Sequence, residues 1–444
     1  MRLLRRILLG LVVLLLVALV GGYWWQRPLL LTGTGYAAHN ACALENISHR
    51  DDPATDLPPN PLVPYLRTSS STEGDQVRVT GSILGVLAKQ TAYYTPGYGC
   101  TLGKVPAVEV VEPSGTAPAV DETEPPSASI PEAVNQAFGD QLSAAERKKL
   151  GTRAIVISVD GKTIMQRYAP GFDASTPQLG WSMTKSITNL TVGRLVAQGK
   201  VSLSDDKLVK DWTDERADIT IDDLLRMTSG LAWDETYSLG TPITRMLYLE
   251  DDMGAYVASQ SAAHRPGTYQ QYSSGSTTLL CDILAKRTGE GASLVRTELL
   301  NPLGLSSAVV EPDAAGTPVC SSYMWATPLE WSAVGQFALD DGMLDGKALL
   351  PEGWMKQSTT VRPVDKTEEQ GYAAGWWVNQ LPDGSLVYPE LPADAYWASG
   401  HDGQWLMIVP SAKLVITRLG FSPEVEDEGV VQLTASVLKA LAAG

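Results

Sequence analysis

The sequence predicts an α/β protein of the α+β type, in which an antiparallel sheet is flanked by helices and adjoins a helical lobe. Two strand patterns, at residues 153–159 and 163–168, are joined by Asp160-Gly161, a strong signal for a β-hairpin. Strand patterns return only near the C-terminus, whereas residues 183–360 have mainly helix and loop patterns. Strands from the two ends of one domain favour a single antiparallel sheet covered by helices. The other expected elements are a helix near residue 132, strands at 372–378, 405–409 and 414–419, and a closing helix near 429–441.

Residues 1–25 predict a transmembrane anchor with a short cytoplasmic tip. Three arginines in the first six residues precede an uncharged apolar run at 7–20, and Tyr23, Trp24 and Trp25 follow it. The segment from residue 7 to residue 25 has the length of about 20 residues that spans a hydrocarbon core. The arginine bias predicts a single-pass protein of the inner (cytoplasmic) membrane whose main domain faces the periplasm or the cell exterior. A cleaved signal peptide is the alternative, but no clear small-x-small site precedes Gly21-Gly22-Tyr23, which favours a retained anchor.

The rest of the chain is expected to form two units joined by a linker, because 444 residues exceed one ordinary core. A small module is expected at residues 26–105, with a β-like segment around 77–86. Residues 106–131 are rich in Pro, Glu, Ala and Ser, the composition of an extended linker. The main domain is expected at residues 132–444. The sequence gives no indication of what the small module does.

Composition excludes several classes of function. A formal charge of −16 argues against nucleic acid or an anionic membrane surface as the main partner. The four histidines lack metal-ligand spacing, and the chain has no phosphate loop or dinucleotide fingerprint, so neither a metal nor a cofactor is expected. The four cysteines could pair in an oxidising compartment, and their spacing leaves the pairing open. A bridge between Cys42 and Cys100 would stabilise the small module, and Cys281 is expected to be a buried core thiol.

The stretch Ser182-Met183-Thr184-Lys185 stands where a helix is expected to begin, and it is the strongest candidate for catalytic chemistry. Lys185 lies one turn from Ser182 on the same helix face, so its ammonium can approach the serine Oγ. The unpaired N–H groups of a helix N-terminus also favour negative charge on that oxygen. The same spacing occurs at Ser204 and Ser436. We expect Ser204 in a polar turn and Ser436 inside the C-terminal helix, so neither matches an exposed serine in a first turn.

Two further motifs follow in order, Tyr272-Ser273-Ser274 and Gly400-His401-Asp402-Gly403-Gln404. The set resembles the serine β-lactamase and penicillin-binding protein superfamily, whose motifs are Ser-x-x-Lys, Tyr-x-Asn or Ser-x-Asn, and Lys-Thr-Gly or His-x-Gly. Residues 224–231 and 321–324 also look like signatures of this family. Within it, residues 132–444 resemble most the class C β-lactamase-related hydrolases, especially the 6-aminohexanoate (nylon oligomer) hydrolases and related esterases.

Acyl transfer requires a base to remove the serine proton, and Lys185 and Tyr272 are expected to do this jointly. The ammonium of Lys185 and the phenolate of Tyr272 would stabilise each other, which is expected to lower the pKa of the phenol. The resemblance implies that the backbone N–H groups of Ser182 and Gln404 bind the tetrahedral oxyanion, with Gly403 allowing a close approach of that strand. By the same resemblance, His401 and Ser274 are expected to contact the substrate.

Departures from the family pattern bear on the substrate. Ser274 replaces the usual asparagine, and His401-Asp402 replaces Lys-Thr, which removes the cation and hydroxyl that would hold a β-lactam carboxylate. Asp402 would repel a carboxylate if it faces the cleft. The pattern therefore favours a serine amidase or esterase acting on a short peptide-like or aminoalkanoyl substrate. A D-alanyl-D-alanine peptidase or β-lactamase is one alternative. A non-catalytic module that binds cell-wall peptides or a partner is another, although the intact Ser182 and Lys185 argue against it.

Overall fold

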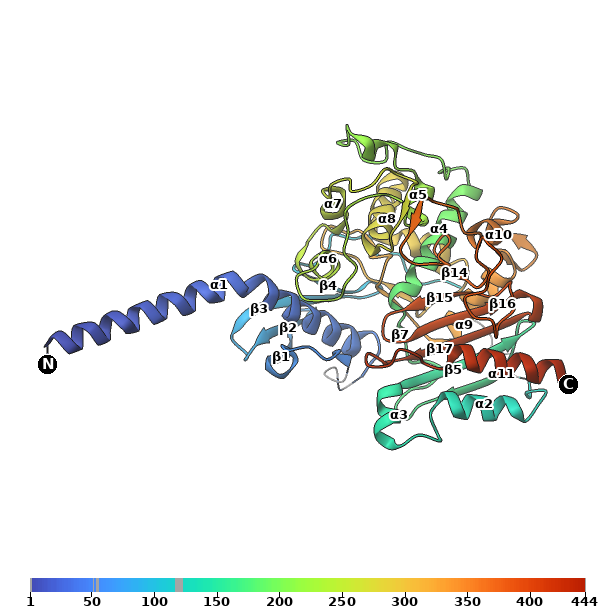
Figure 1. Cartoon of the computed structure of the whole chain (residues 1–444), viewed down its shortest axis with the longest axis horizontal. Coiled ribbons are helices and arrows are strands. Elements are labelled where there is room, and N and C mark those ends of the chain that lie inside the picture. Colours follow the sequence, from blue (N-terminus) through green and yellow to red (C-terminus); the bar gives the residue numbers. More distant parts are fainter. Residues whose placement is uncertain (1, 51, 53–55, 116–122, 444) are drawn as a thin grey trace.

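The C-terminal domain is built around one six-stranded antiparallel sheet with the strand order β14-β15-β16-β17-β5-β6 (Figure 1). The computed structural model describes residues 2–50, 52, 56–115 and 123–443. β17 pairs with β5, from Leu414 opposite Val159 to Gly420 opposite Thr152, so strands from the two ends of the domain lie side by side. The predicted fold class is therefore confirmed. The six strands are β5 Thr152–Val159, β6 Lys162–Tyr168, β14 Trp377–Val378, β15 Tyr396–Gly400, β16 Gln404–Val409 and β17 Leu414–Gly420.

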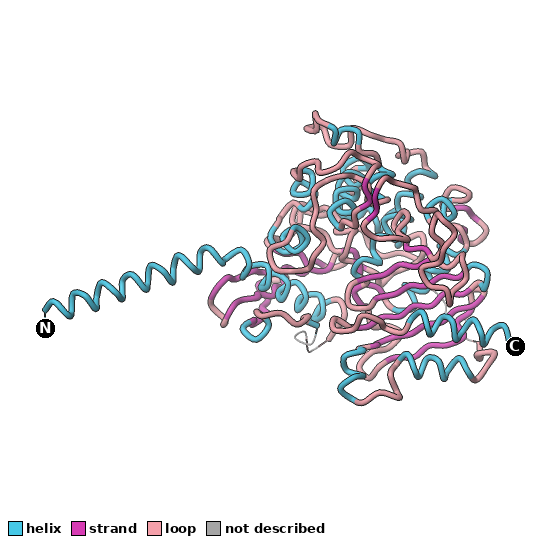
Figure 2. Tube along the Cα trace, viewed as in Figure 1, coloured by secondary structure: helices cyan, strands magenta, loops and turns pink. Residues whose placement is uncertain are grey.

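Side chains of the central strands alternate between two cores on opposite faces of the sheet, as the two-residue period of a strand requires. Ile155 and Ile157 of β5 face one core, together with α2 (Ser129–Ala137) and α11 (Val430–Ala443). Leu406 and Ile408 of β16 face the other core, which contains α9 (Pro328–Leu339) and the helical lobe. Figure 2 shows the sheet between these helical layers.

The predicted hairpin is confirmed, and one predicted strand is shorter than expected. Asp160 and Gly161 between β5 and β6 both have positive φ, 50° and 77°, as a two-residue hairpin turn requires. The expected strand at residues 372–378 is reduced to Trp377–Val378, because Tyr372 forms a bridge with Trp377 and the segment folds back on itself. β15 was not expected from the sequence.

The helical lobe lies between β6 and β14 in the chain. Its helices are α4 Thr184–Ala197, α5 Ile221–Leu225, α6 Pro242–Leu249, α7 Met253–Ala258, α8 Ser274–Thr288 and α10 Trp354–Ser358; α3 (Ala144–Leu150) precedes the sheet. The short strands are β7 Gln178–Leu179, β8 Tyr269–Gln270, β9 Val309–Val310, β10 Met324–Ala326, β11 Met343–Leu344, β12 Lys347–Ala348 and β13 Lys366–Thr367. A disulfide between Cys281 and Cys320 ties α8 to the segment before β10. Cys281 is therefore not the free core thiol expected from its apolar neighbours.

The N-terminal region consists of one 45-residue helix, α1 (Arg2–Asn46), and a four-stranded antiparallel sheet. The strands are β1 Leu66–Glu73, β2 Gln76–Ile83, β3 Leu87–Thr95 and β4 Gly99–Leu102. α1 is long and apolar enough to cross a membrane, and its apolar stretch is not buried by the rest of the protein. Figure 1 shows this stretch projecting away from the body. The Cys42–Cys100 disulfide joins the inner part of α1 to β4.

The N-terminal sheet packs directly on the C-terminal domain. The backbone N–H of Cys100 donates to Glu311 Oε1 at 2.7 Å, and Gln90 Nε2 donates to the carbonyl of Tyr248 at 2.7 Å. Part of the expected linker at 106–131 also contacts the domain, since the Asn301 side chain accepts from the N–H of Ser114. Residues 116–122 of that expected linker lie outside the described residues.

Candidate active site

Ser182 lies in a single 3₁₀ turn, Trp181–Met183, that leads into α4. The preceding Trp181 has φ of +48°, a left-handed conformation that a bulky residue adopts only when its surroundings impose it. The rings of Tyr36, Tyr237, Tyr323 and His401 surround Trp181, with centroid distances between 5.8 and 6.4 Å. The serine is therefore presented by a strained turn that aromatic packing holds in place.

Lys185 is the centre of the polar network. Its Nζ is 2.8 Å from Ser182 Oγ, 2.9 Å from Ser274 Oγ and 3.0 Å from the carbonyl oxygen of Ser321. These three partners use all three donors of an ammonium group. The structure thus brings Ser182, Lys185 and Ser274 together, and it adds a carbonyl from a segment that the sequence marked only as a family signature.

Burial changes the acid–base behaviour of this lysine. Lys185 is 2% exposed, and removal from water lowers its pKa from 10.5 to about 8, against the opposing effect of the carboxylates of Glu235 and Glu369. With a pKa near 8, about one lysine in ten is neutral at pH 7. A neutral amine 2.8 Å from a serine hydroxyl is placed to accept its proton.

Tyr272 lies beside this pair, but its electrostatics differ from the expectation. Burial raises the pKa of its phenol well above the usual value, and the charges of Tyr372 and Glu235 act in the same direction, whereas a hydrogen bond with the Ser182 side chain opposes them. The lysine Nζ stands over the tyrosine ring, 4.8 Å from its centroid. The expected lowering of the phenol pKa is wrong, because burial outweighs the hydrogen bond with Ser182.

Glu235 is the main site residue that sequence reasoning missed. Its carboxylate accepts from the hydroxyl of Ser274, from the Ser274 backbone N–H at 2.8 Å and from Trp233 Nε1 at 2.6 Å. Ser274 therefore connects Lys185 to a carboxylate. The Ser274 side chain is fully buried, which places it behind the lysine and argues against the substrate contact expected of it.

The third motif lies at the hairpin between β15 and β16, against the nucleophile turn. A Cβ on Gly400 would come within 2.1 Å of the carbonyl oxygen of Gly180, so the absence of a side chain permits this approach. Gly403, expected in that role, has φ of +85° and instead faces the guanidinium of Arg418. The Gln404 side chain braces the hairpin by donating to the carbonyl of Gly420 at 2.7 Å.

His401 and Asp402 occupy different environments. The His401 ring stacks on Tyr237 with a centroid distance of 4.4 Å, and its side chain is 35% exposed. The Asp402 side chain is 1% exposed and lies 3.4 Å from His401 Nε2. Asp402 lines a small cavity between α1 and the sheet, and burial raises its pKa. It therefore does not face the open cleft, where it was expected to repel a carboxylate.

The N-terminal helix contributes to the site, which the sequence did not indicate. Tyr36 of α1 contacts the ring of Trp181 and stacks on Tyr248 with a centroid distance of 5.0 Å. His39 of α1 stacks on Tyr323 at 4.2 Å. Because Trp181 precedes the serine and Tyr323 follows the segment that binds the lysine, α1 supports both sides of the site.

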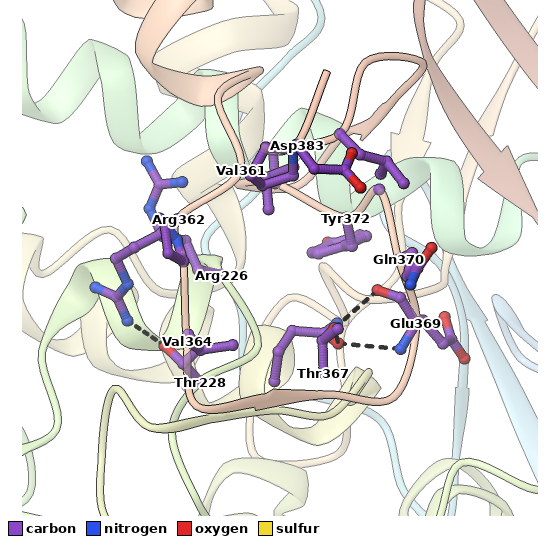
Figure 3. Close-up of a pocket in the computed structure, with 16 residues that line it drawn as sticks. Arg226, Thr228, Val361, Arg362, Val364, Thr367, Glu369, Gln370, Tyr372 and Asp383 are labelled. Atoms are coloured by element: carbon purple, nitrogen blue, oxygen red, sulfur yellow. Dashed lines mark hydrogen bonds between the residues drawn. The ribbon is translucent and has the colours of Figure 1, made fainter. Parts of the chain in front are cut away.

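A pocket of about 300 Å³ adjoins the site. Tyr372 lines it and packs edge-on against Tyr272 with a centroid distance of 5.2 Å. Figure 3 shows the Tyr372 ring pointing into the pocket, with Arg362 and Thr367 on its walls. The Arg362 guanidinium is paired with Asp222 at 2.9 Å, so it is already neutralised. Ser182, Lys185 and Tyr272 do not line this pocket, which lies next to the site on the side of Tyr372.

The two other Ser-x-x-Lys matches lie away from such a network. Ser204 is exposed in a turn and contacts the Ser202 hydroxyl. Ser436 lies within α11, and its hydroxyl is 3.5 Å from Gln432 Nε2. Both placements agree with the expectation.

Comparison with known proteins identifies the family. The model of the β-lactamase family matches residues 140–433, about two thirds of the chain. This protein belongs to the β-lactamase family. The membership agrees with the serine-hydrolase class and the superfamily that the three motifs indicated.

Solved structures show the same fold at low sequence identity. A putative 6-aminohexanoate-dimer hydrolase from Bacillus anthracis is 19% identical with a TM-score of 0.57, and the match covers 76% of this chain and 89% of the other. The hydrolase EstCE1, described as having promiscuous acyltransferase activity, is 16% identical with a TM-score of 0.56 over 70% and 98% of the two chains. A penicillin-binding protein homologue from Caulobacter crescentus is 17% identical with a TM-score of 0.54 over 74% and 99%.

A curated relative matches only a part of the chain. An uncharacterized protein of Alkalihalophilus pseudofirmus is 30% identical over 98 residues, which are 21% of this chain and 29% of the relative. The match thus spans less than a third of that relative's length, and it carries no information on substrate.

Proposed function

We propose that this protein is a membrane-anchored serine hydrolase that cleaves an ester or amide through an acyl-enzyme on Ser182. The observation that carries the proposal is the 2.8 Å contact between Ser182 Oγ and the nearly inaccessible Lys185 Nζ. A lysine with a pKa near 8 supplies a base at neutral pH without a histidine.

In the proposed reaction, neutral Lys185 takes the proton of Ser182 as the oxygen attacks the substrate carbonyl carbon. The backbone N–H groups of Ser182 and Gln404 bind the oxyanion, a role supported by the close approach of Gly400 to Gly180. The proton then passes from the lysine, by way of the neutral phenol of Tyr272, to the departing alcohol or amine. Water attacks the acyl-enzyme with the same base, and release of the acid restores the serine.

The charges around the lysine support a neutral or cationic substrate, such as a short peptide-like or aminoalkanoyl ester or amide. Carboxylates of Glu235 and Glu369 both act on Lys185, and the position of the family's third-motif cation holds His401. A charge-assisted hydrogen bond contributes about 1.5–3 kcal/mol. Its loss lowers the preference for a carboxylate substrate by roughly tenfold to a hundredfold.

The proposal is tested by comparing kcat/KM for p-nitrophenyl butyrate, an aminohexanoyl anilide and benzylpenicillin. We expect the ester and the anilide to exceed the penicillin, and His401→Lys to raise penicillin turnover relative to the ester. Asp402 is left unchanged, because its φ of +59° disfavours a β-branched replacement. Faster turnover of benzylpenicillin than of either other substrate by the unchanged protein would favour a β-lactamase instead.

The apolar part of α1 is proposed as a retained anchor in the inner (cytoplasmic) membrane, with the C-terminal domain on the periplasmic or outer side. The arginine bias and the exposed apolar surface of α1 support this placement. Recovery of a mature protein that starts near Gly22 would contradict a retained anchor.

A further inference from the structure

Exposed apolar side chains gather at one end of the N-terminal sheet. Outside α1, seven large apolar side chains are exposed among the described residues. Four of them, Tyr65, Leu84, Val86 and Leu87, form what we call the tip surface, with exposures of 52%, 58%, 69% and 41%. The N–H of Leu84 donates to the carbonyl of Tyr65 at 2.9 Å, so the two parts of this surface are adjacent. A cluster of apolar side chains exposed to solvent is typical of a site that interacts with a membrane or another protein.

The tip surface lies at the membrane end of the sheet. The N–H of Ala88, next to Leu87, donates to the hydroxyl of Tyr23 at 3.2 Å. Tyr23 belongs to the aromatic group that ends the apolar run of α1, where aromatic side chains mark a bilayer interface. Figure 1 shows β1 to β3 beside the point where α1 leaves the body.

The opposite end of the same sheet points away from that interface. Ser70 in β1 donates to Glu45 near the C-terminal end of α1 at 2.5 Å. A Cβ on Gly81 in β2 would meet the carbonyl of Thr34, further toward the membrane. The strands therefore run along α1, and the turn at Gly74-Asp75 lies about 25 Å from the tip surface, at about 3.3 Å per strand residue.

Charge near the tip surface also suits lipid headgroups. Although the whole chain has a charge of −16, residues 57–72 and 76–108 contain no acidic residue. Arg67 and Lys89 flank the tip surface, are exposed and form no ion pair with the described residues. Basic side chains next to exposed apolar ones are typical of segments that rest in a bilayer interface.

We propose that the tip surface inserts into the interface of the bilayer that holds α1, so that the protein meets the membrane at two points. This inference rests on the membrane anchor of the proposed function, and not on the hydrolase activity. Two contacts fix the orientation of the body relative to the membrane. Because α1 continues without a break from Tyr23 to Tyr36 beside the active site, the active site takes a fixed orientation as well.

The test uses the full chain in vesicles of phosphatidylcholine and phosphatidylglycerol, with an environment-sensitive fluorophore on a single added cysteine. Val86→Cys reports the tip surface and Tyr65→Cys provides a second position on it. Asp75→Cys is the matched control at the far turn, and Leu14→Cys reports the anchor. The circular dichroism spectrum and the thermal unfolding midpoint check that each variant is folded.

We expect labels at Val86 and Tyr65 to emit at shorter wavelength in vesicles and to lose intensity when the lipids carry a nitroxide in the headgroup. The label at Asp75 is expected to do neither, and the label at Leu14 to be quenched by a nitroxide deep in the acyl chains. Quenching at Leu14 without quenching at Val86 and Tyr65 overturns the second contact while the anchor stands. No quenching at Leu14 overturns the anchor, and with it the second contact.

Discussion

Replacing Glu235 with glutamine tests how the site sets the proton affinity of Lys185. The Ser274 hydroxyl donates to the Glu235 carboxylate and accepts from Lys185 Nζ, so it connects the two charged groups. The negative charge of Glu235 favours the ammonium form of the lysine. Glutamine has nearly the same shape, and its amide oxygen can keep the two N–H donors of Trp233 and Ser274. The substitution therefore removes a charge while preserving most of the hydrogen bonds.

The magnitude follows from the geometry. Two hydrogen bonds in series place the carboxylate within about 5.5 Å of Nζ. At an effective dielectric constant of about 20, two unit charges at that separation interact by about 3 kcal/mol. One pKa unit corresponds to about 1.4 kcal/mol, so the charge raises the lysine pKa by about two units at most. Because Glu235 is partly exposed, solvent screening reduces this, and we expect a fall of about one unit, from about 8 to about 7.

The assay is the pH dependence of kcat/KM for a p-nitrophenyl ester between pH 5 and 9.5. If neutral Lys185 is the base, activity rises with pH through the lysine pKa, with a midpoint near 8. Glu235→Gln should move that midpoint to lower pH. Asp234→Asn is the control, since Asp234 is exposed and bonds to the N–H of Thr236. An unchanged or higher midpoint in Glu235→Gln would refute the electrostatic coupling.

Three further results are expected. Lys185→Arg should lower turnover by about a hundredfold or more and abolish the rise of activity with pH, because a guanidinium stays protonated. If Lys185 and Tyr272 form one proton-transfer unit, Tyr272→Phe should lower the turnover of the Lys185→Arg variant by a smaller factor than it lowers that of the unchanged protein. Tyr36→Ala should slow the reaction of Ser182 with a fluorophosphonate by about tenfold, because the turn that carries the nucleophile is misplaced. Tyr36→Phe keeps the ring contact and should react at the original rate. Equal rates for Tyr36→Ala and the unchanged protein would show that α1 does not support the site. Replacing Cys42 and Cys100 together by alanine should lower the free energy of unfolding by about 4 kcal/mol in urea denaturation, and an unchanged midpoint would contradict this.

The sequence predicted those parts of the site that depend on local spacing. Ser182 lies in the 3₁₀ turn that leads into α4, and Lys185 lies three residues later in the first turn of α4. The short spacing across this helical start brings the two side chains into contact. The antiparallel sheet followed from the hairpin at Asp160-Gly161 and from strand patterns at both ends of the domain. β15 was missed because Ala398, Ser399 and Gly400 have weak strand preferences.

Features that depend on tertiary contacts were not predictable. Glu235 comes from a loop between α5 and α6, and no spacing connects it to Ser274 or to Lys185. The raised pKa of Tyr272 results from burial, which a three-residue motif does not reveal. The partner of Cys281 lies 39 residues away without a recognisable pattern.

The central claim, that Ser182 is the nucleophile activated by Lys185, is tested most directly by mapping the covalent adduct of a fluorophosphonate by mass spectrometry. The account predicts one adduct, on Ser182, that forms faster as pH rises toward 9 and is absent in Ser182→Ala. Ser204→Ala and Ser436→Ala should be labelled like the unchanged protein. An adduct on any other serine, or labelling that persists in Ser182→Ala, would contradict the account.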